Sequence, residues 1–227
     1  MKIPLNIVLN KEQEQAVMHD GSPLLVPAGP GSGKTTVIVE RIKQLIKNGM
    51  SPSEILCLTF TDKAANVMKE RLEDFYDVTE MQISTYHSFC HDVLQENVLD
   101  SGIGMSSGVI TKASRLVWAV ENYDAFNFKH VKHGNNPVEV ISSMVEGISN
   151  FKDEFVSPET LRKFLNDELG KPAQLVADVE REAFLHRLED LHKLYVKYQD
   201  YLRAEQLIDY DDMLVETVNL FKISHTY

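Results

Sequence analysis

"LLVPAGPGSGKTTVIVERI", residues 24–42, is the stretch that decides the fold of this 227-residue chain. An apolar run leads into a Gly-rich loop, and a segment with the apolar period of an α-helix follows the loop. Small loop residues let backbone N–H groups converge on phosphate oxygens, and the positive end of the following helix points at the same place. The stretch therefore predicts a strand, a phosphate-binding loop and a helix, in that order.

The loop matches the common phosphate-loop pattern G-x-x-x-x-G-K-[ST], except that Ala28 stands at the first Gly. In this pattern the Lys34 ammonium pairs with the β and γ phosphates, and the Thr35 hydroxyl binds Mg²⁺. We therefore predict ATP and Mg²⁺ as cofactors, with Lys34 and Thr35 as the candidate catalytic residues and Thr35 as the metal ligand. The other predicted nucleotide contacts in the loop are Ala28, Gly29, Pro30, Gly31, Ser32, Gly33 and Thr36.

Strand and helix patterns alternate through the first hundred residues. Apolar runs at 23–28 and 54–60, and the beginning of 81–89, each precede a helical pattern. The continuous apolar character of 54–60 is typical of a parallel strand covered on both faces. This order predicts an open parallel α/β sheet that binds ligands at the carboxyl ends of its strands.

Capping residues mark the ends of these helices. Asn10 is placed to cap a helix that ends near Met18, and Thr61 or Asp62 is placed to cap the helix after the second strand. Gly49 suits the left-handed position that follows the last turn of the phosphate-loop helix. Each of these helices is therefore predicted with its boundaries.

The character of the sequence changes near residue 100, after which helical patterns dominate and we predict no further strand. The longest helical pattern runs from Ala173 to about Glu205 and repeats large apolar residues at heptad-like spacing. We interpret this stripe as helix packing rather than as a surface that stacks on bases. Its members are Phe184, Leu188, Leu191, Tyr195, Tyr198 and Leu202.

The composition indicates a globular protein, with 43% hydrophobic residues and no run that approaches membrane-spanning length. We expect it in the cytoplasm, without a membrane partner. The net charge of −11 argues against attraction of the whole surface to nucleic acid, although a local groove for a single strand remains compatible with it. Cys57 and Cys90 are too few and too isolated for a disulfide framework or metal site, so we expect buried reduced thiols.

The residues that follow the second and third strands combine hydroxyl, aromatic and imidazole side chains at the ligand-binding edge of a parallel sheet. Hydroxyl groups can donate hydrogen bonds to phosphate oxygens, and aromatic rings can stack on the faces of bases. We therefore predict that this edge binds a single strand of nucleic acid. The candidate contacts are Thr59, Phe60, Thr61, Thr85, Tyr86 and His87.

Taken together, these segments resemble the UvrD/Rep/PcrA family of superfamily 1 DNA helicases. "LNKEQEQAV" is similar to the family's adenine-reading Q motif and "VPAGPGSGKTT" to its motif I. "LTFTDKAANVMKERL" is similar to motif Ia and "STYHSF" to motif Ib, in the family's order. "LIDYDDMLVETVNLF" resembles the helix that precedes motif II.

The resemblance implies a RecA-like ATP-binding domain at 1–90, a helical subdomain inserted at 91–205, and a return to the RecA-like domain at 206–227. It implies ATP-driven 3′ to 5′ movement on single-stranded DNA and unwinding at a duplex junction. The resemblance also implies that Gln13 recognises adenine. An amide side chain can both donate a hydrogen bond to the edge of the adenine base and accept one from it. Lys63 and Ser88 join the DNA contacts.

The sequence departs from the family where Thr36 replaces a frequent Arg, so any nucleotide contact by that Arg is lost. It also contains no strand that ends in Asp-Glu, which hydrolysis requires for Mg²⁺ and the attacking water. Asp209 is better explained as a helix N-cap. The resemblance places motif II soon after Tyr227 and the arginine finger beyond it.

We therefore expect the N-terminal portion of a helicase, which binds nucleotide by itself but hydrolyses ATP poorly. Its partner is the remaining C-terminal helicase region, and an open sheet edge without that region invites edge-to-edge homodimers.

Two other functions stay open. A non-catalytic nucleotide-binding or protein-interaction module would use the helical part as its working surface. A P-loop kinase would need a lid with arginines, whereas the arginines of the helical part are scattered along it. They are Arg115, Arg162, Arg181, Arg187 and Arg203. Binding of nucleotide and of single-stranded DNA distinguishes the three functions.

Overall fold

The computed structural model describes residues 8–101, 103–104, 107–131, 136–169 and 176–224. The chain divides into two compact units, Met1–Phe89 and Cys90–Tyr227. The expected return of 206–227 to a first RecA-like domain stays a prediction.

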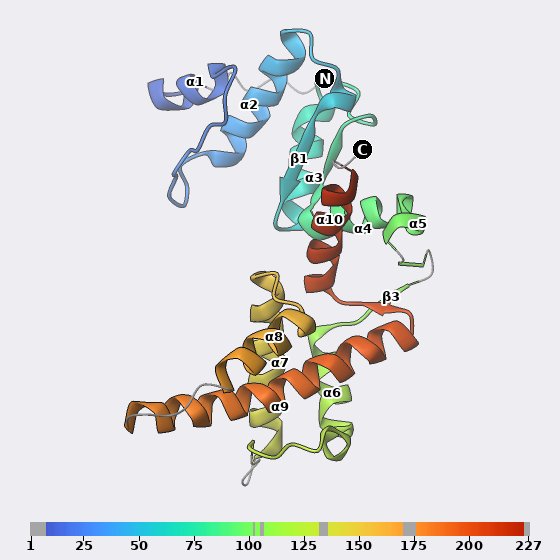
Figure 1. The fold of residues 1–227 in the computed structure, drawn as a ribbon. Coiled ribbons are helices and arrows are strands. Elements are labelled where there is room, and N and C mark those ends of the chain that lie inside the picture. The colour runs from blue at the N-terminus through green and yellow to red at the C-terminus, as the bar shows by residue number, and fades with distance from the viewer. Residues whose placement is uncertain (1–7, 102, 105–106, 132–135, 170–175, 225–227) are drawn as a thin grey trace. The chain divides into compact units, whose positions relative to one another are not determined.

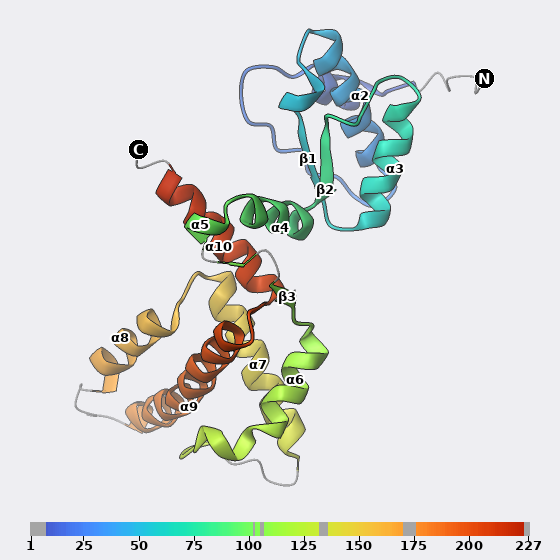
Figure 2. The same ribbon diagram turned by 90° about the vertical axis from the view of Figure 1, so that its right-hand side faces the viewer.

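The first unit is built from α1 (Lys11–Met18), α2 (Lys34–Lys47), the short 3-10 helix η1 (Pro52–Glu54), β1 (Leu56–Thr59), α3 (Asp62–Glu73) and β2 (Gln82–Thr85). The two strands pair in parallel, with Thr59 opposite Thr85, and Figure 2 shows them side by side. The helix α4 (Tyr86–Glu96) follows β2 directly. Parallel strands that alternate with helices confirm the predicted α/β class for this unit.

The predicted capping residues begin and end these helices. The Asn10 side chain accepts a hydrogen bond from the backbone N–H of Gln13 at 2.8 Å, and the Thr61 hydroxyl accepts one from Ala64 at 3.2 Å. Gly49 follows α2 with a φ of 102°, a left-handed value that favours glycine. Local hydrogen bonding therefore places the helix ends as the sequence predicted.

The core of the first unit lies on one face of the two strands, where α2 and α3 cover them. Cys57 of β1 is buried in this core, whereas the adjacent Leu56 is 47% exposed. Neighbouring residues of a strand point to opposite faces, so the expectation of cover on both faces is wrong for the described part of this unit. The core residues are Val39, Ile42, Ile55, Cys57, Ala65, Met68, Leu72, Val78, Met81 and Ile83.

Residues 23–28 do not form the predicted strand. Their apolar side chains lie at the surface, and Leu25 is 88% exposed. A strand is stable only beside a hydrogen-bonded neighbour, and no hydrogen bond between backbone groups joins this segment to another described part of the chain. Apolar composition alone therefore does not make a strand, because the pairing that a strand requires is not present among the described residues.

The second unit is mostly helical, as predicted. It contains α5 (Val98–Ser101), α6 (Lys112–Glu121), the 3-10 helix η2 (Tyr123–Phe126), α7 (Pro137–Asp153), α8 (Pro158–Leu169), α9 (Val176–Ala204) and α10 (Tyr210–Ser224). The long helix α9 packs against α7 and α8, as Figures 1 and 2 show. The mixed α/β class with a helical part is therefore confirmed for the chain.

Large side chains of α9 fill the core of the second unit. Tyr195 and Tyr198 are buried, which confirms that they pack between helices. Phe184 is 51% exposed, so it does not belong to the buried stripe, and its neighbour Leu185 is buried instead. A straight α-helix has 3.6 residues per turn, so its buried face drifts away from a strict seven-residue repeat over several turns.

A short pair of strands in the second unit was missed. β3 (Gly108–Val109) and β4 (Leu207–Ile208) pair in parallel. Two residues are too few to produce a recognisable apolar alternation, so the expectation of no further strand is wrong for a physical reason. A side chain at Gly108 would lie 3.0 Å from Leu207, which explains the glycine at this close approach.

β4 leads directly into a buried cluster of charged side chains. Asp209 accepts hydrogen bonds from Lys152 at 2.7 Å and from the Tyr198 hydroxyl at 2.9 Å. Its second oxygen accepts the backbone N–H of Asp212 at 2.7 Å, which confirms Asp209 as the N-cap of α10. Lys152 also pairs with Asp212 at 2.8 Å, and Arg115 with Asp209 at 3.4 Å. Burial is tolerated because each charge has a partner.

Candidate nucleotide-binding site and nucleic-acid interface

The phosphate loop turns at two glycines with left-handed backbone conformations. Gly31 has a φ of 73° and Gly33 a φ of 81°, values that other residues adopt at a cost. A Cβ at Gly33 would also lie 3.0 Å from the side-chain nitrogen of Gln13, whereas Gly29 has open space around it. Ala28 has no positive φ, so its replacement of the usual glycine introduces no strain.

The Lys34 side chain folds back over this loop. Its ammonium donates hydrogen bonds to the carbonyl oxygens of Gly29 at 2.7 Å and Ala28 at 3.2 Å. An ammonium has three donors, so one more can reach a ligand. The Ser32 hydroxyl donates to the same Gly29 carbonyl at 2.8 Å. The loop carbonyls thus hold the Lys34 ammonium against the loop.

The first turn of α2 presents backbone N–H groups, because its N-cap Gly33 offers no side chain to satisfy them. Unsatisfied N–H groups at the positive end of a helix bind anions such as phosphate. Thr35 and Thr36 lie in this turn and are half-buried, while Pro30 and Gly31 are exposed at the tip of the loop. The geometry of the loop suits a polyphosphate, and the Mg²⁺ contact of Thr35 stays a prediction.

Gln13 connects α1 to the phosphate loop. Its side-chain oxygen accepts the backbone N–H of Asn10 at 3.0 Å, and its side-chain nitrogen donates to the Ser32 carbonyl at 3.0 Å. Both ends of the amide are therefore engaged within the protein. Reading of adenine by Gln13 stays a prediction, and it requires exchange of at least one of these bonds.

Arg41 is a functional candidate that sequence reasoning missed. Its guanidinium donates to the carbonyl oxygens of Ala16 at 3.1 Å, Val17 at 3.4 Å and His19 at 2.6 Å, at the end of α1. A cation at a helix C-terminus satisfies carbonyls that have no partner within the helix. Arg41 therefore holds α1 beside α2, and no local pattern indicated this, because its partners lie 22 to 25 residues away.

A pocket of about 520 Å³ lies between α1, the segment before the loop and α2. This volume is within the range of small-ligand sites. Its wall combines apolar side chains with the polar groups of the loop described above. The lining residues are Asn10, Glu12, Gln13, Ala16, Leu24, Val26, Pro27, Ala28, Gly29, Ser32, Lys34, Val37, Ile38 and Arg41.

Two aromatic rings lie together at the carboxyl end of the strand pair. Because Thr59 pairs with Thr85, the next residues Phe60 and Tyr86 emerge side by side, with ring centroids 5.5 Å apart. Phe60 is 90% exposed and Tyr86 is 43% exposed. The structure thus brings these two predicted DNA contacts together, and their stacking on bases stays a prediction.

The hydroxyl groups at this edge also have structural roles. Thr85 is buried, and its hydroxyl accepts the backbone N–H of Ser88 at 3.2 Å and contacts the Ser88 hydroxyl at 2.8 Å. Thr61 caps α3, next to the exposed Lys63. Exposed groups such as Lys63 and Ser88 are therefore better placed than Thr85 for a phosphate. Thr59 and His87 are half-buried.

The two cysteines are free thiols, and they lie in the interior of the protein. Cys57 and Cys90 are both buried free thiols, as expected, and burial raises the pKa of Cys57. A raised thiol pKa lowers reactivity because the thiolate is the nucleophile. Across the described ranges, no helix has both the length and the apolar character that crossing a membrane requires.

Comparison with known proteins identifies the family. The family described as "UvrD/REP helicase N-terminal domain" matches residues 9–226. The ATP-dependent DNA helicase UvrD1 of Mycobacterium leprae is 32% identical over 221 residues, which cover 94% of this chain and 25% of that protein. The ATP-dependent DNA helicase PcrA of Bacillus subtilis is 32% identical over 221 residues, covering 94% and 26%. This chain spans about a quarter of the length of the curated relatives it matches, and it belongs to the UvrD/REP helicase N-terminal domain family.

Proposed function

We propose that this chain supplies the ATP-binding region of an ATP-dependent DNA helicase. The observation that carries this proposal is the Lys34 ammonium, held by two loop carbonyls at the start of a helix whose N-terminus has no side-chain cap. A fixed cation beside free backbone N–H groups is complementary to a polyphosphate. The names of the relatives, ATP-dependent DNA helicases, support the same activity.

In this proposal different residues of the first unit bind the phosphates, the metal and the base of the nucleotide. Lys34 neutralises the β and γ phosphates, the first turn of α2 donates N–H groups to their oxygens, and the Thr35 hydroxyl holds Mg²⁺. The metal supplies charge neutralisation for phosphoryl transfer to water. The pocket beside Gln13 accepts the adenine, and Arg41 keeps the pocket formed by holding α1 in place.

The exposed pair Phe60 and Tyr86 provides the grip on single-stranded DNA. Base stacking on aromatic rings does not depend on sequence, which suits movement along a strand. We propose that ATP hydrolysis drives this movement in the 3′ to 5′ direction and opens the duplex at a junction. A net charge of −11 requires that the DNA contact be local, as this edge of the sheet is.

Fast hydrolysis depends on groups supplied by the rest of a helicase. The sequence has no strand that ends in Asp-Glu, so we propose that this chain alone binds nucleotide and hydrolyses ATP slowly. The apolar segment 23–28 is exposed and has no paired strand. This supports a partner, the remaining helicase region, that would cover the segment. Without that partner, pairing between the open edges of two copies is the expected outcome.

Titration with a fluorescent ATP analogue and Mg²⁺ tests the proposal. We expect Lys34→Ala to weaken binding at least about tenfold, because a charge-assisted contact is worth about 1.5–3 kcal/mol. Lys47→Ala, at the opposite end of α2, is the matched control and should bind as the unaltered chain does. Equal affinity for the Lys34 variant and the control would refute the nucleotide site. Absence of both nucleotide and single-stranded DNA binding would favour the protein-interaction module.

A further inference from the structure

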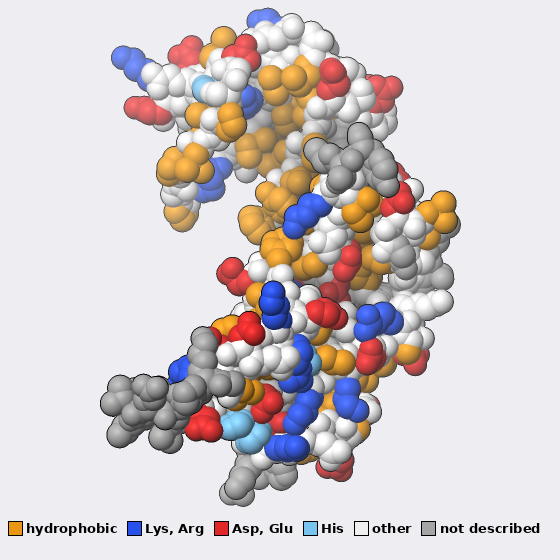
Figure 3. Space-filling view, viewed as in Figure 1, with side chains coloured by type: hydrophobic (Ala, Val, Ile, Leu, Met, Phe, Trp, Pro, Cys, Tyr) orange, Lys and Arg blue, Asp and Glu red, His pale blue; other side chains and the backbone are white. Residues whose placement is uncertain are grey.

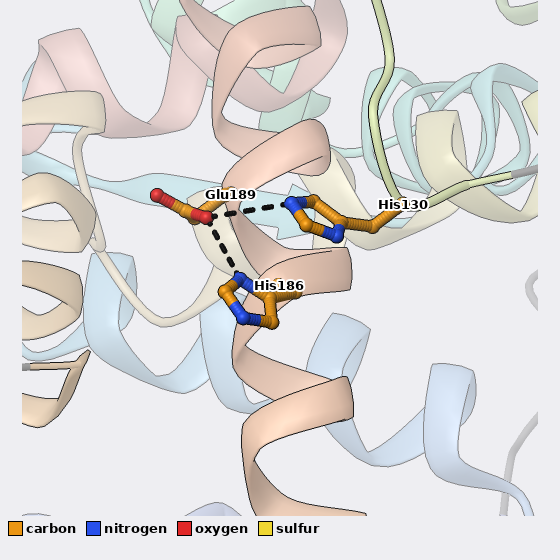
Figure 4. Close-up of side chains that lie close together, drawn as sticks. All are labelled: His130, His186 and Glu189. Atoms are coloured by element: carbon orange, nitrogen blue, oxygen red, sulfur yellow. Dashed lines mark hydrogen bonds and ion pairs between the residues drawn. The ribbon is translucent and has the colours of Figure 1, made fainter.

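A cluster of two histidines and a glutamate lies in the second unit, and its residues belong to none of the sequence motifs. His130 precedes α7, whereas His186 and Glu189 lie on α9, and Figure 4 shows the carboxylate facing both imidazoles. A Glu189 oxygen is 3.1 Å from Nδ1 of His186 and 3.8 Å from Nε2 of His130. Figure 3 shows histidine side chains reaching the surface among Lys and Arg side chains on this unit.

The backbone around His130 is fixed independently of this cluster. The Asp190 carboxylate, next to Glu189 and fully buried, accepts the backbone N–H groups of Lys129 at 3.0 Å, His130 at 2.6 Å and Val131 at 2.8 Å. The Asp190 carboxylate therefore holds the backbone at His130 beside α9.

The helix positions the other two side chains. His186 and Glu189 are three residues apart, a spacing that places them on one face of α9. The second ring nitrogen of His186, Nε2, lies 3.7 Å from a carboxylate oxygen of Glu182, one turn earlier. A carboxylate on the far nitrogen of a metal-binding histidine orients the ring and raises its basicity. Glu182 is thus placed as a positioning residue for His186.

The geometry points to a binding site for a divalent transition-metal ion such as Zn²⁺, with His130, His186 and Glu189 as its protein ligands. Two imidazoles and a carboxylate, with water in the fourth position, form a common zinc ligand set. Metal–ligand bonds of about 2.0–2.1 Å place tetrahedral ligands about 3.3 Å apart. The three ligand atoms already lie within 4.8 Å of one another, and the imidazoles are stacked with centroids 4.2 Å apart. To bring both nitrogens to a shared ion, the two rings must turn out of this stacked arrangement.

Occupation of this site would connect the segment that carries His130 to α9. A ligand that binds only the folded state stabilises it, so the second unit should melt at a higher temperature with the metal bound. The site is in the helical unit, so these effects do not depend on the proposed nucleotide binding.

Isothermal titration of the full chain with ZnCl₂ tests the site. We expect one ion per chain, with affinity at least tenfold lower in His130→Ala, His186→Ala and Glu189→Gln, because each variant removes one of three ligands. Glu182→Gln should weaken binding less, since Glu182 only orients His186. His91→Ala removes a histidine of the same unit that is paired with Asp92 at 3.7 Å, and it should bind zinc normally.

Circular dichroism of each variant without metal separates lost binding from lost folding, and Glu189→Gln preserves the size of the side chain. Zinc-dependent thermal stabilisation that disappears with EDTA and in the three ligand variants would complete the support. Failure of the unaltered chain to bind zinc, or equal affinity in all variants, would overturn the site. Either result leaves the nucleotide titration with Lys34→Ala unaffected, so the two proposals fail independently.

Discussion

Charged and polar side chains have opposite roles in the two units of this protein. In the first unit, Lys34 and Lys63 lie at the surface, where a ligand can reach them. In the second unit, Lys152 and Arg115 are buried, and both pair with the buried Asp209 carboxylate. The comparison shows that a charged residue indicates a binding site only when its environment leaves it accessible. Exposed charges are available for function, while buried charges specify how the helices pack.

The largest expected effect is on the buried cluster. Lys152→Ala leaves the carboxylates of Asp209 and Asp212 buried without their shared ammonium, so we expect a loss of about 3–5 kcal/mol in the free energy of unfolding. Urea denaturation followed by circular dichroism measures this loss. The exposed Lys197→Ala on α9 is the control and should change stability by less than about 0.5 kcal/mol. Equal stability of the two variants would show that the cluster is not structurally important.

The second expected effect is a dependence of folding stability on pH, through Asp212. Burial raises the pKa of Asp212 to about 6, although Lys152 opposes the shift, and the nearby Asp209 adds to it. A carboxyl group with a raised pKa stabilises the folded state when it is protonated, and this stabilisation disappears as the pH rises from about 4 to 6. The shift from 3.8 to about 6 corresponds to at most about 3 kcal/mol.

Asp212→Asn should therefore gain stability relative to the unaltered chain as the pH rises from 4 to 6. Urea midpoints measured at several pH values for both proteins give this difference. Asp209 has the opposite effect on stability, because its pKa is lowered despite its burial. Its contribution to the free energy of unfolding is therefore lost as the pH falls. A constant difference between Asp212→Asn and the unaltered chain across this range would contradict the raised pKa of Asp212.

The smallest effect on folding is expected at the exposed aromatic edge. Phe60 is 90% exposed, so Phe60→Ala should leave the free energy of unfolding nearly unchanged. Loss of one base-stacking contact should nevertheless weaken single-stranded DNA binding by about 1–3 kcal/mol, measured by fluorescence anisotropy. Phe75→Ala is a suitable control, because the Phe75 ring contacts Lys43 rather than the strand ends. If both variants bind DNA equally, Phe60 is not a contact.

Much of the first unit was predictable because its signals are local. The Asn10 and Thr61 caps bond to residues three positions away, and Gly31 and Gly33 adopt the backbone conformations that a phosphate loop needs. The register of the two strands then places Phe60 beside Tyr86, as a parallel sheet requires. In contrast, the predicted strand at 23–28 failed, because an apolar segment becomes a strand only when another segment pairs with it.

The sequence by itself determined the turn glycines of the loop, the capped helix ends of the first unit and the order of motifs, since these depend on hydrogen bonds and spacings within a few residues. Only the tertiary structure decided that both ends of the Gln13 amide are engaged and that Arg41 holds α1. It also placed Asp209 against Lys152, 57 residues earlier in the chain, and His130 against Glu189. Contacts at such separations depend on how whole helices pack, and no local pattern of residues records that packing.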